Sequence, residues 1–83
     1  MTDKAEGPAV VSEIVVDARG HRCPVPTLKL RRALEAAPEG ARLRLLADDP
    51  LAKIDVPHFL SQTGASLVDL TESGGALSFS IAK

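Results

Sequence analysis

The alternating segment 42–47 constrains the fold of this chain most strongly. Its leucines and its alanine fall mainly on one side of an extended strand, and two arginines fall on the other. A strand of this kind has one face buried against a single layer and the other face in water. Segment 76–82 repeats the pattern, because apolar residues alternate with serines along it. The sequence therefore predicts a sheet that is covered on one face only.

Two helices are predicted to cover that face. Residues 24–37 place four apolar residues on one side at helical spacing: Leu30, Ala33, Leu34 and Ala37. The second helix is expected in two pieces, because proline breaks a continuous helix and Pro57 lies inside it. The pieces are one turn over 50–54 and a restart that Asp55 caps and Gly64 closes. Asp48 and Asp49 are also interpreted as helix caps.

Two further strands complete the predicted sheet. Residues 13–17 are rich in β-branched side chains, and residues 66–72 are joined to the last strand by a turn with two glycines. The order βαβαββ predicts an α/β (α+β) two-layer sandwich, with a four-stranded mixed sheet and two helices packed on one face. We expect a single domain over 12–83, preceded by a flexible leader at 1–11.

Composition and charge exclude several classes of protein. Cys23 is the only cysteine, which excludes an intramolecular disulfide and a small secreted scaffold built on disulfides. A formal net charge of −1 gives no overall attraction to nucleic acid or to anionic lipid. No apolar run approaches the ~18 residues of a membrane span, and the N-terminus does not resemble a signal peptide. The expected compartment is the cytoplasm, and no spacing of ligands predicts a metal site.

The surroundings of Cys23 predict a reactive thiol. The residue lies where the first helix is expected to begin, and a helix N-terminus stabilises a thiolate. Residues 18–34 contain five basic residues and no acidic one. This environment predicts that the pKa of the thiol falls from ~8.5 towards ~7 or lower. The five basic residues are Arg19, Arg22, Lys29, Arg31 and Arg32.

Four neighbours of Cys23 are predicted to shape the site. Pro24 and Pro26 fall in the first helical turn, where they fix the backbone and hold the sulfur in one orientation. Asp17 is expected to bond to the loop backbone, and Gly20 ends the preceding strand. Without a second cysteine, cycling between dithiol and disulfide within one chain is excluded. A lone thiolate can be oxidised, or it can accept a sulfur atom as a persulfide and pass it on.

The motif CPVP at 23–26, followed by ADDP at 47–50 and DVPHF at 55–59, resembles the TusA/SirA-type family of small CPxP sulfur carriers. The resemblance covers about residues 14–83 and implies the same order of strands and helices. It implies a sulfurtransferase without a cofactor, whose Cys23 accepts persulfide sulfur from a cysteine desulfurase or another donor. The sulfur then passes to an acceptor protein, as in tRNA thiolation or sulfur oxidation. Val25 stands where the tRNA-thiolation members have glutamate, so the pathway stays open.

Partner binding has two interpretations. In the first, the basic residues dock the carrier on an acidic protein, because sulfur transfer requires two cysteines to meet. The absence of an aromatic platform disfavours direct binding to nucleic acid. In the second, the chain is a non-catalytic regulatory or adaptor domain that binds a partner through its basic helix face, and Cys23 is incidental or a redox sensor. His21 is interpreted as a solvated loop residue, with a role as proton acceptor as the alternative.

Overall fold

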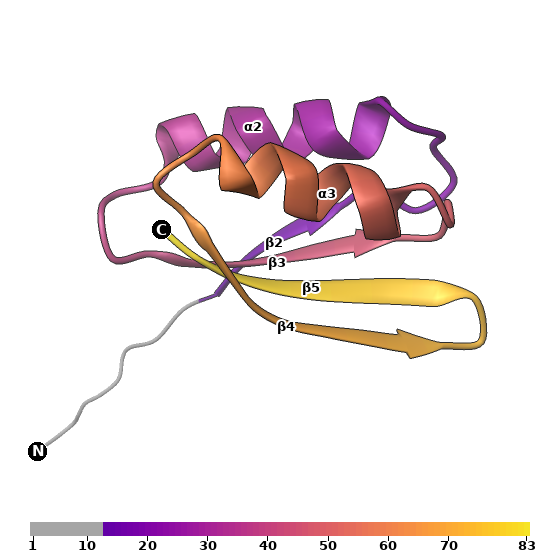
Figure 1. Ribbon diagram of the computed structural model, residues 1–83. Helices are drawn as coiled ribbons and strands as arrows, with labels where there is room; N and C mark the ends of the chain where they lie inside the picture. Colours follow the sequence, from indigo (N-terminus) through magenta and orange to yellow (C-terminus); the bar gives the residue numbers. More distant parts are fainter. Residues whose placement is uncertain (1–12) are drawn as a thin grey trace, which may run out of the picture.

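The computed structural model describes residues 13–83. The predicted leader at 1–11 and the expected domain boundary at residue 12 lie outside this range. The elements, in chain order, are β2 (Glu13–Asp17), α2 (Val25–Ala36), β3 (Arg42–Ala47), α3 (Ala52–Ser61), β4 (Ser66–Ser73) and β5 (Ala76–Ala82) (Figure 1). The predicted order βαβαββ is confirmed.

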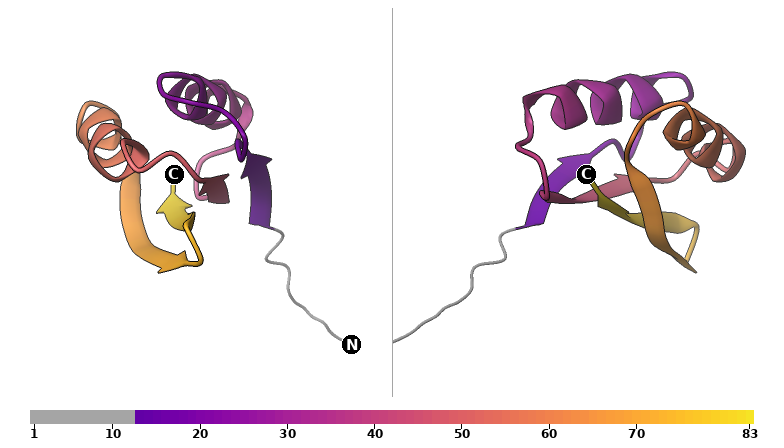
Figure 2. Two further views of the ribbon diagram at one scale, coloured as in Figure 1. Left: turned by 90° about the vertical axis from the view of Figure 1, so that its right-hand side faces the viewer. Right: turned by 60° about the vertical axis from the view of Figure 1, so that its left-hand side comes forward.

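The four strands form one mixed sheet in the order β2-β3-β5-β4. Strand β2 pairs with β3 in parallel, and β5 pairs with both β3 and β4 in antiparallel fashion. Both helices lie on the same face of the sheet, with α2 against β2 and β3 and α3 against β4 (Figures 1 and 2). The predicted two-layer sandwich is therefore confirmed. Both helices begin at the end of the sheet where the loops after β2 and β3 lie together (Figure 1).

The core lies between the sheet and the two helices. The predicted apolar side of α2 is buried at Leu30 and Leu34. In the strands, the inward residues of the alternating pattern are fully buried, because the helices remove them from water. The largest fully buried apolar side chains of the sheet are Leu43, Leu45, Phe79 and Ile81. Val56 and Leu60 bury the same side of α3.

The opposite face of the sheet is polar around Arg44. The Nε atom of Arg44 donates to Glu13 Oε1 at 2.9 Å, and Nη1 donates to Ser78 Oγ at 2.5 Å. The Glu13 carboxylate raises the pKa of the Arg44 guanidinium by hydrogen bonding and by its charge. This ion pair joins β2 to β3 across the face that the sequence predicted to be in water.

Helix α3 differs from its prediction. It is continuous from Ala52 to Ser61, with Pro57 inside it, so Asp55 lies in the first turn and caps no second helix. The backbone N–H groups of residues 52–54 donate to carbonyls three residues earlier at 2.9 to 3.1 Å, so the turn at 50–54 leads directly into the helix. Pro57 has no N–H group and so removes one hydrogen bond of the helix. Burial of the apolar side of α3 keeps the helix together across this gap.

The C-terminal end of α2 has a cap that the sequence analysis missed. The Lys83 ammonium donates to the carbonyl oxygen of Leu34 at 2.6 Å and also to that of Ala37. The backbone N–H of Lys83 donates to Ala41 O at 2.9 Å, which fixes the residue beside the helix end. A positive charge is favourable there, because the last carbonyls of a helix are otherwise unsatisfied and carry partial negative charge.

Replacement of Lys83 by methionine removes these bonds but keeps the aliphatic stem. Because hydrogen bonds to a charged group are lost at a helix end, we expect the free energy of unfolding to fall by about 1–2 kcal/mol. Urea denaturation followed by circular dichroism measures the change.

Lys53→Met is the matched control for Lys83→Met. Lys53 forms a half-exposed ion pair with Glu72 at 2.6 Å. Pairs of this kind contribute about 0–1 kcal/mol. An equal loss of stability in the two variants would contradict the capping role of Lys83.

Candidate functional site

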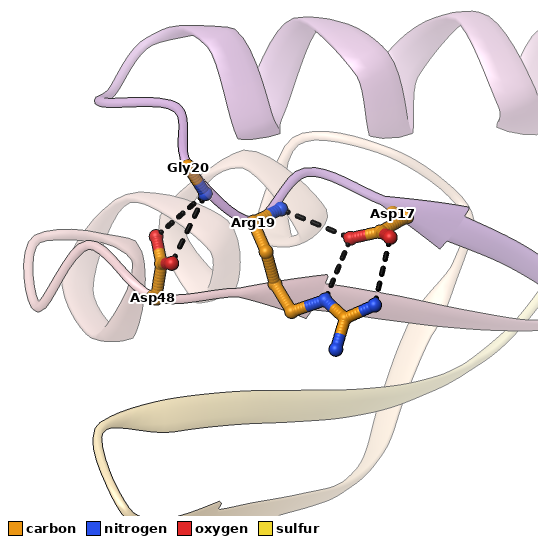
Figure 3. Close-up of polar contacts among 4 residues, drawn as sticks. All are labelled: Asp17, Arg19, Gly20 and Asp48. Carbon is orange, nitrogen blue, oxygen red and sulfur yellow. Dashed lines mark hydrogen bonds and ion pairs between the residues drawn. The ribbon is translucent and has the colours of Figure 1, made fainter.

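The loop between β2 and α2 begins with an ion pair. Two nitrogens of the Arg19 side chain donate to the Asp17 carboxylate, Nε to Oδ1 at 2.9 Å and Nη2 to Oδ2 at 2.8 Å (Figure 3). The backbone N–H of Arg19 adds a third bond to Oδ1 at 3.1 Å. These bonds hold the pKa of Asp17 well below its usual range and raise that of Arg19. Asp17 thus bonds to the loop backbone, as expected. The side chain of Arg19, which was predicted to dock a partner, is already paired with this carboxylate.

Asp48, at the end of β3, holds the middle of the same loop. Both of its carboxylate oxygens accept the backbone N–H of Gly20 at 3.0 Å (Figure 3). Gly20 has φ +84°, a conformation that other residues rarely adopt, so the glycine permits this approach. Asp48 was predicted to be a helix cap; in the structure it joins two loops that are 28 residues apart in sequence.

Asp49 connects Cys23 to the start of α3. Its Oδ2 atom accepts the backbone N–H of Cys23 at 2.8 Å, and Oδ1 accepts that of Leu51 at 3.0 Å. The bond from Cys23 and the bond from Leu51 lower the pKa of Asp49. Asp49 was predicted to be a helix cap, but the N-cap of α3 is Leu51 and has no side-chain cap bond. Asp49 instead supports the turn before α3 and fixes Cys23. This contact could have been expected from the parallel pairing of β2 and β3. The loops that follow two neighbouring parallel strands lie at the same end of the sheet.

The thiol of Cys23 is partly buried and packs against the hydrophobic core. Its pKa is raised to about 11, first by burial, then by hydrogen bonding and proximity to the Asp55 carboxylate, and further by Asp49. The predicted lowering of this pKa is therefore wrong. With a pKa near 11, roughly one thiol in ten thousand is ionised at pH 7.

Several of the amide groups at the start of α2 are missing or already bonded. Pro24 is the N-cap residue and Pro26 follows in the first turn, and neither has an N–H group. The N–H of Val25 donates to Arg22 O at 2.9 Å, and that of Cys23 is bound by Asp49. Two of the N–H groups at this helix start are thus missing and two are occupied, which leaves fewer free donors for an anion. Pro26 is buried, and the Cys23–Pro24 peptide bond is cis.

The five basic residues do not form one surface. Lys29 and Arg32 line a groove between α2 and β2, whereas Arg31 lines a hollow between α2 and α3. Arg31 is also paired with Glu35 at 3.5 Å. Arg22 is exposed in the Cys23 loop, where its charge helps to lower the pKa of Asp49. The predicted docking residues are thus distributed over both sides of α2 and its preceding loop.

Comparisons with known proteins identify the family of this chain. The family described as "Sulfurtransferase TusA" matches residues 14–83. The chain belongs to this family. "Sulfur carrier protein TusA" of Allochromatium vinosum is 38% identical to it over 68 residues, which cover 82% of this chain and 90% of the relative. The protein of the same name in Pseudomonas fluorescens is 34% identical, with 82% of each chain covered.

A solved structure supports the fold of this TusA-family chain. The "SirA-like protein" from Desulfitobacterium hafniense superposes with a TM-score of 0.72 and 21% identity, over 83% of this chain and 95% of that one. At this identity the likeness concerns the fold alone. The resemblance found in the sequence to TusA/SirA-type proteins is confirmed by the family match and by the relatives named above.

The candidate site consists of one thiol and the carboxylates around it. Within residues 13–83, no group of three or more histidine, cysteine or acidic side chains is arranged to hold a metal ion. In the same range, neither helix combines the length and the apolar character of a membrane span. His21 is exposed and lines a shallow hollow beside Asp48 and Asp49. The reactive group of this site is the Cys23 sulfur, and burial, then Asp55 and Asp49, raise the pKa of its thiol.

The rate of alkylation by iodoacetamide reports the ionised fraction of Cys23, so its dependence on pH measures the thiol pKa. We expect an inflection near 11 for the wild-type protein. Asp55→Asn removes a negative charge beside the sulfur, so the inflection moves to lower pH and alkylation at neutral pH becomes faster.

Asp69→Asn is the matched control for Asp55→Asn. Asp69 lies on β4, where its register partner is Ser80, and its charge acts on Arg44 rather than on Cys23. The control should leave the inflection of Cys23 unchanged. A wild-type inflection at or below ~8.5, or no shift in Asp55→Asn, would contradict the electrostatic role of Asp55.

Proposed function

We propose that Cys23 carries sulfur as a persulfide from a donor protein to an acceptor protein. In the loading step, the Cys23 thiolate attacks the outer sulfur of a persulfide on the donor cysteine. The bond between the two donor sulfurs breaks, and the donor cysteine leaves as a thiolate that takes up the proton released by Cys23. The products are Cys23–S–SH and the free donor thiol, so no external oxidant or reductant is needed. Unloading is the same exchange with an acceptor thiolate as the nucleophile.

One observation carries this proposal. Cys23 is the only cysteine of the chain, and its backbone is fixed by Asp49 in the loop that opens α2. A thiol without a second cysteine can exchange sulfur only with another molecule. The relatives named sulfur carrier proteins support the same role.

The raised pKa of Cys23 suits a carrier between partners. During loading the Cys23 sulfur attacks as an anion, and during unloading it leaves as an anion. Burial and the carboxylates of Asp55 and Asp49 oppose the negative charge in both steps. The free carrier therefore resists oxidation when empty and retains its sulfur when loaded. A cationic group of a partner beside these carboxylates would lower the pKa and allow transfer in the complex.

The partners in this proposal are a cysteine desulfurase or another persulfide donor, and an acceptor sulfurtransferase or sulfur-relay protein. Transfer between thiols requires the two proteins to dock, and the exposed cations near Cys23 offer contacts for an acidic surface. Acceptors that serve tRNA thiolation and those that serve sulfur oxidation are both compatible with this chemistry. The cytoplasmic location expected from the sequence stays a prediction.

The alternative is a non-catalytic regulatory or adaptor domain in which Cys23 is incidental or a redox sensor. It predicts that binding to a partner persists unchanged in Cys23→Ser. The redox-sensor form of this alternative is disfavoured by the structure, because sensor cysteines are exposed and have a low pKa. In this chain the pKa of Cys23 is raised to about 11 and the thiol is partly buried.

Mass spectrometry tests the proposal directly. After incubation with a cysteine desulfurase, pyridoxal phosphate and cysteine, the wild-type chain should gain one sulfur atom that dithiothreitol removes. Cys23→Ser lacks the acceptor thiol and should gain none. Inorganic polysulfide serves as a second, protein-free donor. If neither donor adds a sulfur atom to the wild-type chain, the proposed function is wrong.

A further inference from the structure

The side-chain hydroxyl of Thr27, in the first turn of α2, is buried and has no hydrogen-bond partner. Among the side chains of 13–83 that are not exposed, it is the only buried nitrogen or oxygen atom without one. A threonine in a helix commonly donates its hydroxyl to a carbonyl three or four residues earlier, as Thr63 does to Leu60 O at 2.9 Å. Because an unpaired buried hydroxyl is unfavourable, the exception at Thr27 needs a reason.

Thr27 lies on the side of α2 that faces the core. Leu30 and Leu34 follow it at helical spacing, and both are buried. Cys23 immediately precedes the N-cap of α2 and packs against the same core. The Cα–Cβ bonds of a helix tilt toward its N-terminus, so the side chain of Thr27 leaves the backbone toward the end of α2 where Cys23 lies. The hydroxyl and the sulfur thus belong to the core-facing side of one helix start.

Thr27 also holds the hydrogen-bond donors that the start of α2 leaves unused. The two prolines have no N–H group, and the backbone N–H groups of Cys23 and Val25 are already bonded. The backbone N–H of Thr27 bonds to no residue of 13–83, as is usual in the first turn of a helix. Among residues 23–27, Thr27 is therefore the only one that offers two free donors, its N–H and its hydroxyl.

The sulfur atom that Cys23 carries is an acceptor for these donors. A sulfur–sulfur bond is about 2 Å long, so the outer sulfur of a persulfide extends well beyond Cys23 Sγ. In the unloaded chain the Thr27 hydroxyl does not bond to Sγ. The charged groups that act on this sulfur are the carboxylates of Asp55 and Asp49, which only accept hydrogen bonds when ionised. An anionic outer sulfur therefore needs a donor from another residue.

We propose that the hydroxyl and the backbone N–H of Thr27 donate hydrogen bonds to the outer sulfur of the Cys23 persulfide and hold it at the start of α2. This inference rests on the proposed function and adds a residue that binds the carried sulfur. The bonds form only in the loaded carrier. They favour the anionic persulfide there, in opposition to the two carboxylates, and leave the empty thiol unaffected.

The pH dependence of alkylation, measured on the loaded and on the empty carrier, tests the inference. The chain is loaded with inorganic polysulfide, or with a cysteine desulfurase and cysteine, and the excess donor is removed. Iodoacetamide reacts with the ionised sulfur, and mass spectrometry separates the alkylated persulfide from the alkylated thiol. The inflection of the rate against pH is then determined for each form.

Thr27→Val removes the hydroxyl and nearly preserves the shape of the side chain. We expect the inflection of the persulfide to move to higher pH by roughly half a unit or more, which is about a threefold loss of ionised persulfide at lower pH. The inflection of the empty thiol should stay in place, because the hydroxyl does not bond to Cys23 Sγ. The free energy of unfolding of the empty carrier should be equal or higher, because an unpaired buried hydroxyl is removed.

Two control variants accompany Thr27→Val. Thr27→Ser keeps the hydroxyl and should retain the persulfide inflection of the wild-type chain. Thr71→Val makes the same chemical change on β4, where Thr71 is exposed and its register partner is Ser78. It should leave both inflections unchanged. A purely structural role of Thr27 would move the inflection of the thiol together with that of the persulfide.

The possible outcomes distinguish the inference from the proposed function. An unchanged persulfide inflection in Thr27→Val would overturn the inference, because the hydroxyl would then serve the fold or a buried water molecule only. Equal shifts of the persulfide and the thiol would also overturn it, as would a Thr27→Ser variant that behaves like Thr27→Val. In each of these cases the wild-type chain is loaded and the proposed function stands. Failure of both donors to load the wild-type chain would overturn the proposed function, and the inference with it.

Discussion

The site depends on two neighbouring carboxylates that join the loop after β2 to the loop after β3. Asp48 binds the backbone N–H of Gly20, and Asp49 binds that of Cys23. These are charge-assisted hydrogen bonds between segments that are more than 25 residues apart, so they define where the thiol lies relative to both helices. The parallel pairing of β2 and β3 makes them possible, because it brings the two loops to the same end of the sheet. Cys23 lies on a loop, and these bonds hold that loop at the end of the sheet.

The interactions that position Cys23 also suppress its ionisation. Asp49 fixes the backbone of Cys23 and, together with Asp55, places negative charge beside the sulfur. An enzyme that acts alone would need the opposite field, because its nucleophile must be ionised before the substrate binds. A carrier meets its donor and its acceptor as separate proteins, so each partner can provide the charge that the free protein lacks. In the proposed function, holding the sulfur is thus separate from transferring it.

Most of the fold could be predicted from local patterns. The alternation at 42–47 and 76–82 predicted a sheet with one buried face, and the spacing of Leu30 and Leu34 predicted the buried side of α2. The local pattern was misleading at α3. Pro57 predicted a break, but the helix is continuous because its apolar side is buried. Local patterns also missed Lys83 on the end of α2, because that contact joins residues 49 positions apart.

The sequence by itself determined that there is one thiol, that it opens the first helix, and that basic residues follow it. Only the tertiary structure decided the field around that thiol. Asp49 and Asp55 lie beyond β3 in the chain, and the crossover brings them to Cys23, while Arg19 and Arg31 are bound by carboxylates nearby. Charges act through distance in space rather than through separation in sequence, and burial strengthens them by excluding water. For this reason the position of the thiol was predictable from the sequence and its pKa was not.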